Sequence, residues 1–157
     1  MKRKILLIDD EELVIKSVSK LLTKEGYEVV SCKSGEEALE KVKSDLIDLI
    51  VCDIRMPNLT GIDTVRKIRE FQIGAGRKAT PEILITGYAD ENVIKEAETL
   101  QIADYIYKPF DLRDFLACIK KHMEGGYEDK SNILLIPKKL LSTSMSLCSA
   151  ILTNSNI

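Results

Sequence analysis

An uncharged run near the middle of the chain, residues 49–53, ends in the carboxylate of Asp53 and is soon followed by Pro57. Its apolar residues are β-branched or aliphatic, which is typical of a parallel strand that helices bury on both faces. Asp53 is then expected at the carboxyl end of this strand, where open α/β sheets collect ligands and reactive groups. A single aspartate at a strand end more often only caps the next turn. The role of Asp53 therefore depends on what the other strands bring to the same edge.

Stretches of strand and helix character alternate along most of the chain. Short apolar stretches predict strands at 4–8, 27–32, 49–53, 83–86 and 104–107. Helical spacing predicts helices at 12–25, after Ser34, around 62–68, after Asp90 and after Asp111, whereas 71–81, with two glycines and a proline, predict a loop. This alternation predicts an α/β fold: a doubly wound, five-stranded parallel sheet of the flavodoxin-like type, with strand order 2-1-3-4-5.

Side chains suited to phosphate chemistry fall directly after these predicted strands: Asp9, Asp10, Asp53, Thr86 and Lys108. Parallel strands end at one edge, so we expect the five side chains together, with the aspartates flanking the point where strand order reverses. Two carboxylates about 4 Å apart repel by roughly 4 kcal/mol at an effective dielectric of 20, so a proton or a cation must offset them. With oxygen ligands alone, Mg²⁺ is the best-suited ion.

A carboxylate nucleophile, a divalent cation and a lysine are the groups needed for attack on phosphorus. Lys108 would place a positive charge beside a phosphoryl oxygen, and Thr86 would donate a hydrogen bond. Both would stabilise the negative charge on the equatorial oxygens of the transition state. The expected product is an aspartyl phosphate at Asp53.

Composition excludes several classes of function. The 157 residues fit one ordinary domain with a short remainder, and the net charge of −2 predicts no direct binding to nucleic acid. Four scattered cysteines and the lack of a signal peptide or an apolar run of about 18 residues predict a cytoplasmic protein without membrane contact. The one histidine, His122, argues against a zinc site or a catalytic triad, and we expect it to interact with a helix dipole.

The chain resembles the receiver domain of bacterial two-component response regulators over residues 2–123. The resemblance rests on a specific set of motifs in one order: Asp9-Asp10, Asp53 before Met56-Pro57 and Gly61, Thr86-Gly87, and Lys108-Pro109-Phe110. Two departures are small, because the family often has alanine at the position of Gly87 and the 71–81 loop looks slightly long. The resemblance implies that Asp53 accepts a phosphoryl group from a sensor histidine kinase or a phosphotransfer protein.

The same resemblance implies roles for the neighbouring residues. Asp10 and Asp53 would bind Mg²⁺ directly, Asp9 would bind it through water, and Arg55 would contribute its backbone carbonyl. Thr86 and Tyr105 match the family's switch pair, and Lys108 matches a lysine that precedes a proline in a cis peptide. A phosphorylated receiver would then change its binding surface for a downstream protein, whose identity the sequence does not reveal.

Two other classes of protein use a similar fold or a similar set of reactive groups. A haloacid dehalogenase-like phosphatase also combines aspartate, Mg²⁺, threonine and lysine, but it needs a second acid two residues after the nucleophile, where this chain has Arg55. A flavodoxin-like cofactor binder would need glycines and free backbone N–H groups after the first strand, where this chain has acids. We therefore predict a phosphorylation-controlled binding module that transfers only its own phosphoryl group, with the phosphatase as the alternative.

The receiver domain is expected to span residues 1–124, leaving 125–157 as a tail of unknown role. These residues are too few for a separate output domain, which suggests a stand-alone receiver or part of a longer regulator. Between Ser131 and Ile157 the only charges are Lys138 and Lys139, unlike a solvated linker. The tail is expected to form a short extended segment and then a helix, which fold back on the receiver or pair two copies as a homodimer. The alternative is a truncated or non-native extension that stays loose.

Overall fold

Five strands alternate with five helices in residues 1–87 and 91–125, the part of the chain that this computed structural model describes. In chain order the elements are β1 (Lys4–Ile8), α1 (Glu12–Lys24), β2 (Glu28–Cys32), α2 (Gly35–Ser44), β3 (Leu49–Asp53), α3 (Gly61–Gly74), β4 (Glu82–Thr86), α4 (Glu91–Thr99), β5 (Asp104–Tyr107) and α5 (Leu112–Glu124). The predicted alternation is confirmed, and each predicted strand lies within about one residue of its observed position.

The strands form one parallel sheet with the predicted order β2-β1-β3-β4-β5. The register pairs Ile8 of β1 with Cys52 of β3, so the next residues, Asp9 and Asp53, leave the sheet side by side. On the other side of β3, Asp53 pairs with Ile85, one residue before Thr86. The register therefore brings the ends of three strands to one place at the carboxyl edge.

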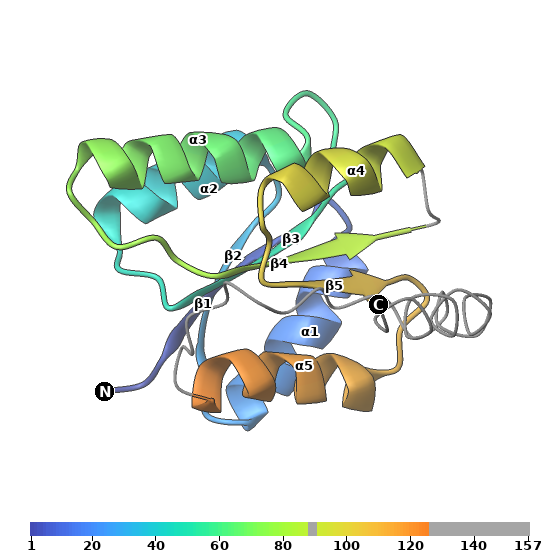
Figure 1. The fold of residues 1–157 in the computed structure, drawn as a ribbon. Coiled ribbons are helices and arrows are strands. Elements are labelled where there is room, and N and C mark those ends of the chain that lie inside the picture. Colours follow the sequence, from blue (N-terminus) through green and yellow to red (C-terminus); the bar gives the residue numbers. More distant parts are fainter. Residues whose placement is uncertain (88–90, 126–157) are drawn as a thin grey trace, which may run out of the picture. The chain divides into compact units, whose positions relative to one another are not determined.

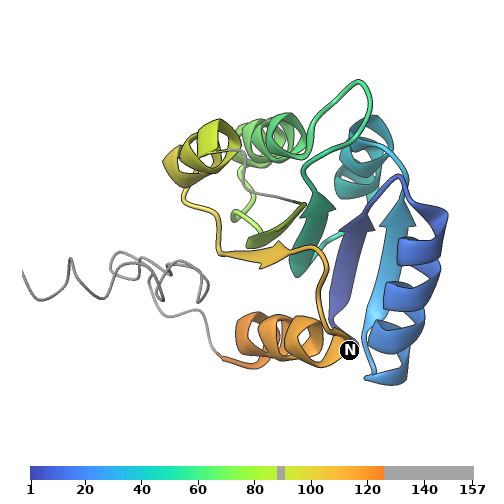
Figure 2. The same ribbon diagram turned by 90° about the vertical axis from the view of Figure 1, so that its right-hand side faces the viewer.

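Helices cover both faces of the sheet, as Figures 1 and 2 show. Helices α2, α3 and α4 pack on one face, where Val42, Val65 and Ala97 meet strand residues such as Ile50. Helices α1 and α5 pack on the other face around a cluster that includes Phe115. Every residue of β3 is buried, because both faces of this central strand are covered. The doubly wound architecture predicted from the apolar runs is confirmed.

The predicted loop at 71–81 is wrong in its first part, because α3 continues to Gly74. Phe71 packs against the core, and Gln72 is buried despite its amide. The Gln72 amide nitrogen donates to the Thr80 hydroxyl at 2.7 Å, and its oxygen accepts from the Thr80 backbone N–H at 3.2 Å. These contacts with the following loop hold the last turn of α3, and they involve residues too far apart for helical periodicity to reveal.

Some predictions concern residues outside the described part. They include the helix cap at Asp90, the extended segment and helix of the tail, and the homodimer that the tail would form, all of which stay predictions. The domain boundary at 124/125 also stays a prediction. Within residues 1–87 and 91–125, none of the helices has both the length and the apolar character needed to cross a membrane.

Candidate functional site

Three aspartates meet at the carboxyl edge of the sheet. Asp9 and Asp10 follow β1, and Asp53 ends β3; one carboxylate oxygen from each lies within 4.8 Å of the others. Asp9 is fully buried, Asp53 is 4% exposed, and Asp10 faces solvent. The structure thus brings together the acidic cluster predicted from the strand ends, with one side open to the solvent.

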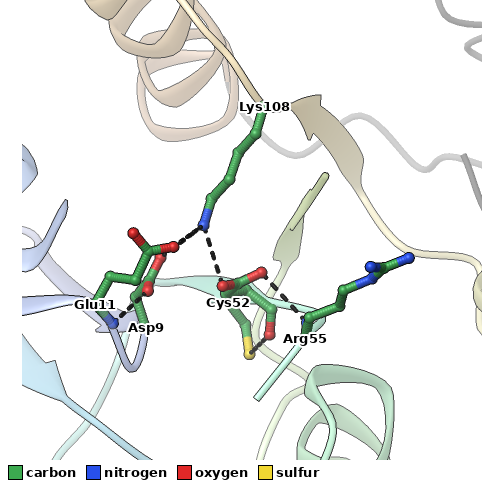
Figure 3. A network of polar contacts seen from close by, with 6 residues as sticks. Asp9, Glu11, Cys52, Arg55 and Lys108 are labelled. Atoms are coloured by element: carbon green, nitrogen blue, oxygen red, sulfur yellow. Dashed lines mark hydrogen bonds and ion pairs between the residues drawn. The ribbon is translucent and has the colours of Figure 1, made fainter. Parts of the chain in front are cut away.

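Lys108, which follows β5, directs its ammonium group into this cluster (Figure 3). Its Nζ lies 3.1 Å from Asp53 Oδ2 and 3.5 Å from Asp9 Oδ2. The Lys108 backbone N–H donates to the Thr86 carbonyl at 2.7 Å, and the bond from Lys108 to Pro109 is cis, as the resemblance implied. Lys108 is thereby anchored through its backbone while its side chain reaches across to β1 and β3.

Glu11 is a member of the cluster that the sequence analysis did not assign. Its Oε1 lies 3.2 Å from Lys108 Nζ, and its backbone N–H donates to Asp9 Oδ1 at 2.8 Å (Figure 3). The signal available in the sequence was its place directly after Asp9 and Asp10, at the same predicted edge. Its orientation toward Lys108 depends on how the residues between β1 and α1 meet the residue that follows β5.

Burial controls the protonation of the inner carboxylates. It raises the pKa of Asp9, partly offset by the hydrogen bond from Glu11, and the negative charge of Asp53 raises it further. Burial also raises the pKa of Asp53, against the opposing effect of the Lys108 charge. A single lysine therefore does not compensate the buried negative charge, and a divalent cation bound at the open side would.

Replacing Asp9 with asparagine should stabilise the protein increasingly as pH rises. Because the folded-state pKa of Asp9 is raised, the contribution of Asp9 to stability is largest below the unfolded pKa of about 3.9 and is lost as pH rises through the folded pKa. The Asp9→Asn variant has no carboxylate at this position, so its free energy of unfolding does not fall in this way as pH rises. We expect its gain in free energy of unfolding, measured by urea denaturation without divalent cations, to be larger at pH 7 than at pH 4.

The control for this measurement is Asp114→Asn, which changes an exposed aspartate in the first turn of α5. It should show no gain in stability over wild type that grows toward pH 7, because its carboxylate lies in solvent. A difference for Asp9→Asn that stays the same between pH 4 and pH 7 would contradict the raised pKa of Asp9.

Thr86 and Tyr105, the predicted switch pair, lie on adjacent strands. Thr86 ends β4 and is 4% exposed. Tyr105 packs against the face covered by α2, α3 and α4, and burial raises the pKa of its hydroxyl to about 12. Among the described residues, this buried hydroxyl has no hydrogen-bond partner. The Tyr105 ring therefore already lies inward in this structure.

Arg55 contributes its backbone rather than its side chain to the surroundings of Asp53. Its N–H donates to Asp53 Oδ1 at 3.3 Å, and its guanidinium points away from Lys108 in Figure 3. The carbonyl role implied for Arg55 stays a prediction.

Gly61, a residue of the motif after Asp53, has a structural role that only the tertiary structure reveals. Its N–H donates to the Ile54 carbonyl at 2.9 Å, and a Cβ added to it would lie 2.2 Å from the Asp53 carbonyl oxygen and 2.8 Å from the Ile54 Cα. The first residue of α3 therefore sits directly against the backbone that carries Asp53. Only a residue without a side chain fits this approach.

Gly61→Ala should destabilise the domain by about 1–3 kcal/mol, because the backbone atoms that it would meet cannot move aside as a flexible side chain could. Urea denaturation measures this loss. Gly74→Ala at the other end of α3 is the matched control, since nothing lies within 4 Å of its added Cβ, and it should be neutral or slightly stabilising. Equal effects of the two substitutions would argue against the close approach.

Comparisons with known proteins agree with this geometry. Residues 5–120 match the response regulator receiver domain. The chain is 34% identical over 122 residues to the transcriptional regulatory protein CrdR of Helicobacter pylori, covering 77% of this chain and 55% of the relative. It is 33% identical over 120 residues to the alkaline phosphatase synthesis transcriptional regulatory protein PhoP of Bacillus subtilis, covering 76% and 48%.

Solved structures show the same fold. A CheY-like response regulator receiver domain protein from Methanospirillum hungatei superposes with a TM-score of 0.72 at 28% identity, covering 79% of this chain and 95% of the other. The chemotaxis protein CheY4 of Vibrio cholerae gives a TM-score of 0.70 at 27% identity, covering 77% and 98%.

The fold and the acidic edge are those of a two-component signalling module. The chain belongs to the response regulator receiver domain family, as the match over residues 5–120 shows. It spans about half the length of the curated relatives that it matches. The haloacid dehalogenase-like alternative finds no support, since the family match and the solved structures are those of receivers.

Proposed function

We propose that this receiver domain accepts a phosphoryl group on Asp53 from the phosphohistidine of a sensor histidine kinase or a phosphotransfer protein. The observation that carries this proposal is the 3.1 Å approach of Lys108 Nζ to Asp53 Oδ2, beside the two aspartates that follow β1. Asp53 is the one carboxylate of the three that both ends the central strand and contacts Lys108 at this distance. It is therefore the nucleophile.

In the transfer, a carboxylate oxygen of Asp53 forms a bond to phosphorus as the bond from phosphorus to the donor's imidazole nitrogen breaks. The electron pair of the broken bond goes to the imidazole. Lys108 is held close enough to Asp53 to neutralise an oxygen of the transferred group. Thr86, at the end of β4, supplies a hydroxyl donor on the other side of Asp53. The domain transfers its own phosphoryl group and acts on no other substrate.

The acidic cluster fits a Mg²⁺ ion. Its three carboxylates offer oxygen ligands within 4.8 Å of one another, and burial has raised the pKa of two of them. Asp10 and Asp53 would bind the ion directly, Asp9 through water, and Arg55 through its carbonyl. When bound, Mg²⁺ supplies positive charge that stabilises the equatorial oxygens of the phosphoryl group.

Phosphorylation would act on a downstream protein through the surface formed by α4, β5 and α5. We propose that Thr86 moves toward the phosphoryl oxygen and that Tyr105, whose ring already packs against the core, rotates further inward into the space that Thr86 leaves. The Tyr105 hydroxyl, which has no hydrogen-bond partner among the described residues, supports this proposal. A buried hydroxyl without a hydrogen-bond partner costs free energy, and a shift of nearby groups on phosphorylation would allow it to find a partner.

Thr86→Ala should accept phosphate but fail to transmit it. The alanine keeps the strand end and loses the hydroxyl that the phosphoryl group would attract. Amide exchange over α4, β5 and α5 should then change little on phosphorylation, whereas wild type should change clearly. Thr80→Ser keeps a hydroxyl away from the acidic edge and serves as the control. A full wild-type response in Thr86→Ala would disprove the coupling.

The output partner is a protein rather than nucleic acid in this proposal. Two relatives are named transcriptional regulatory proteins, but this chain matches only about half of each. We therefore take from them only that the receiver acts on a downstream partner. The net charge of −2 offers no general attraction for phosphate backbones. The predicted cytoplasmic location stays a prediction.

Phosphotransfer from a panel of purified, autophosphorylated sensor kinases tests the proposed function. One kinase should transfer its label to this chain within seconds to minutes when Mg²⁺ is present and much more slowly after chelation. Absence of transfer from every kinase, together with absence of labelling by a small acyl phosphate, would overturn it.

A further inference from the structure

A second group of metal-ligating side chains lies at the opposite end of β5 from the acidic cluster. Asp104 begins β5, whereas Lys108 follows its other end. Cys118 and His122 lie on α5, four residues apart, so they project from the same side of the helix. One ligand atom from each of Asp104, Cys118 and His122 lies within 4.8 Å of the others. The group joins a strand to the helix that packs on it.

The contacts within this group orient its ligand atoms. The Asp104 Oδ1 accepts the Tyr105 backbone N–H at 2.9 Å, which leaves Oδ2 directed at α5. His122 Nε2 lies 2.8 Å from that Oδ2, and the His122 side chain is only 4% exposed. Cys118, in the turn before His122, is partly buried and carries its sulfur as a thiol rather than a disulfide. A nitrogen, an oxygen and a sulfur ligand thus face one another.

An ordinary ion pair explains part of this arrangement. Asp104 also lies 3.2 Å from Lys121 Nζ, so a carboxylate paired with two bases would tie α5 to β5 without any metal. An ion pair of this kind does not, however, require the thiol of Cys118 beside it. The Lys121 side chain is half exposed, and such pairs contribute little, so it can turn to solvent when another cation takes the carboxylate.

We propose that Asp104, Cys118 and His122 form a zinc-binding site, against the expectation drawn from the single histidine, because the fold brings a thiol and a carboxylate to it. Zn²⁺ prefers sulfur and imidazole ligands, accepts a carboxylate, and in three-ligand sites completes its tetrahedron with water. Mg²⁺, the ion suited to the acidic cluster, prefers oxygen ligands throughout. The mixed ligand set therefore separates the two sites by chemistry as well as by position.

The distances need only small adjustments. With bonds of about 2.0–2.1 Å to nitrogen and oxygen and about 2.3 Å to sulfur, tetrahedral ligands stand roughly 3.3–3.6 Å apart. The 2.8 Å contact between His122 and Asp104 would open by about 0.5 Å as the ion replaces the shared proton, and the thiol would approach by up to about 1 Å. The thiol proton is released to solvent on binding, and the proton between His122 Nε2 and Asp104 moves to Nδ1 or to solvent, so that a neutral imidazole binds the ion.

The site is accessible and its occupancy would have a local consequence. His122 lines an open cavity at this end of the sheet, and Asp104 and Cys118 are each partly exposed, so an ion has a short path from solvent. A bound ion would hold the last turns of α5 against the start of β5. Because ligand binding to the folded state stabilises it, Zn²⁺ should raise the melting temperature of the domain.

Co²⁺ is the spectroscopic probe that tests this proposal, used on the full chain carrying Cys148→Ser and in excess Mg²⁺. The substitution removes the thiol that lies outside the described residues, and Mg²⁺ occupies the three aspartates at the other edge. We expect a thiolate-to-cobalt absorption band, displaced by one equivalent of Zn²⁺. Cys118→Ser should abolish the band, and His122→Gln and Asp104→Asn should each weaken Zn²⁺ binding at least about tenfold.

Two controls separate this site from the other groups. Cys32→Ser changes a buried thiol on the opposite face of the sheet and should keep the band, as should Asp53→Asn in the acidic cluster. Circular dichroism checks that each variant folds. Absence of the band in the parent chain, or its survival in Cys118→Ser, would overturn the proposal. A zinc-dependent rise in melting temperature that Cys118→Ser retains would also overturn it.

Discussion

Asp53→Asn should abolish phosphorylation of this chain. Incubated with Mg²⁺ and a small acyl phosphate, wild type should gain the mass of one phosphoryl group, and the variant should gain none. The substituted amide would keep the size of the side chain and its place beside Lys108 but would lack the anionic oxygen that attacks phosphorus. Intact-protein mass spectrometry under native conditions measures the difference directly.

Asp114→Asn provides the matched control, because it makes the same chemical change at an exposed helix position. It should take up one phosphoryl group, as wild type does. If Asp53→Asn also gained a full phosphoryl mass, the acceptor would have to be another residue, and Asp10, the solvent-facing carboxylate of the cluster, would be the next candidate.

Asp10→Ala should weaken Mg²⁺ binding by at least about tenfold, the loss typical when support for a metal site is removed. Asp10 is the solvent-facing member of the three carboxylates and would be a direct ligand of an ion entering from that side. Isothermal titration calorimetry measures the affinity. The loss should exceed that from Glu11→Ala, because Glu11 contacts Lys108 and lies outside the group of three.

The comparison with Glu11 is informative because the two acids are neighbours in the chain. Removing Glu11 takes one anion from Lys108, so a small change in Mg²⁺ affinity is expected, through charge alone. Equal losses of Mg²⁺ affinity in Asp10→Ala and Glu11→Ala would indicate that the ion binds nearer to α1 than the proposed ligands do.

Local sequence patterns were sufficient for the fold and for most of the site. The apolar run at 49–53 predicted a strand covered on both faces, and every residue of β3 is buried. Because parallel strands end at one edge, the positions of Asp9, Asp53 and Lys108 after three strands predicted that they would meet, and the structure brings both carboxylates within 3.5 Å of Lys108 Nζ. Helix ends were less predictable, since the last turn of α3 depends on Gln72 and Thr80.

Contacts between separate elements were decided only in the tertiary structure. His122 was expected to interact with a helix dipole, yet its ring faces Asp104, 18 residues earlier in the chain. Gly61 entered the sequence analysis only as part of the motif that follows Asp53, and the structure shows that it touches the backbone of Asp53. Periodicity tells which side of an element is buried, because that depends on the local geometry of one helix or strand. Which atoms of two elements meet depends on how they dock, and a repeating pattern carries no information about that.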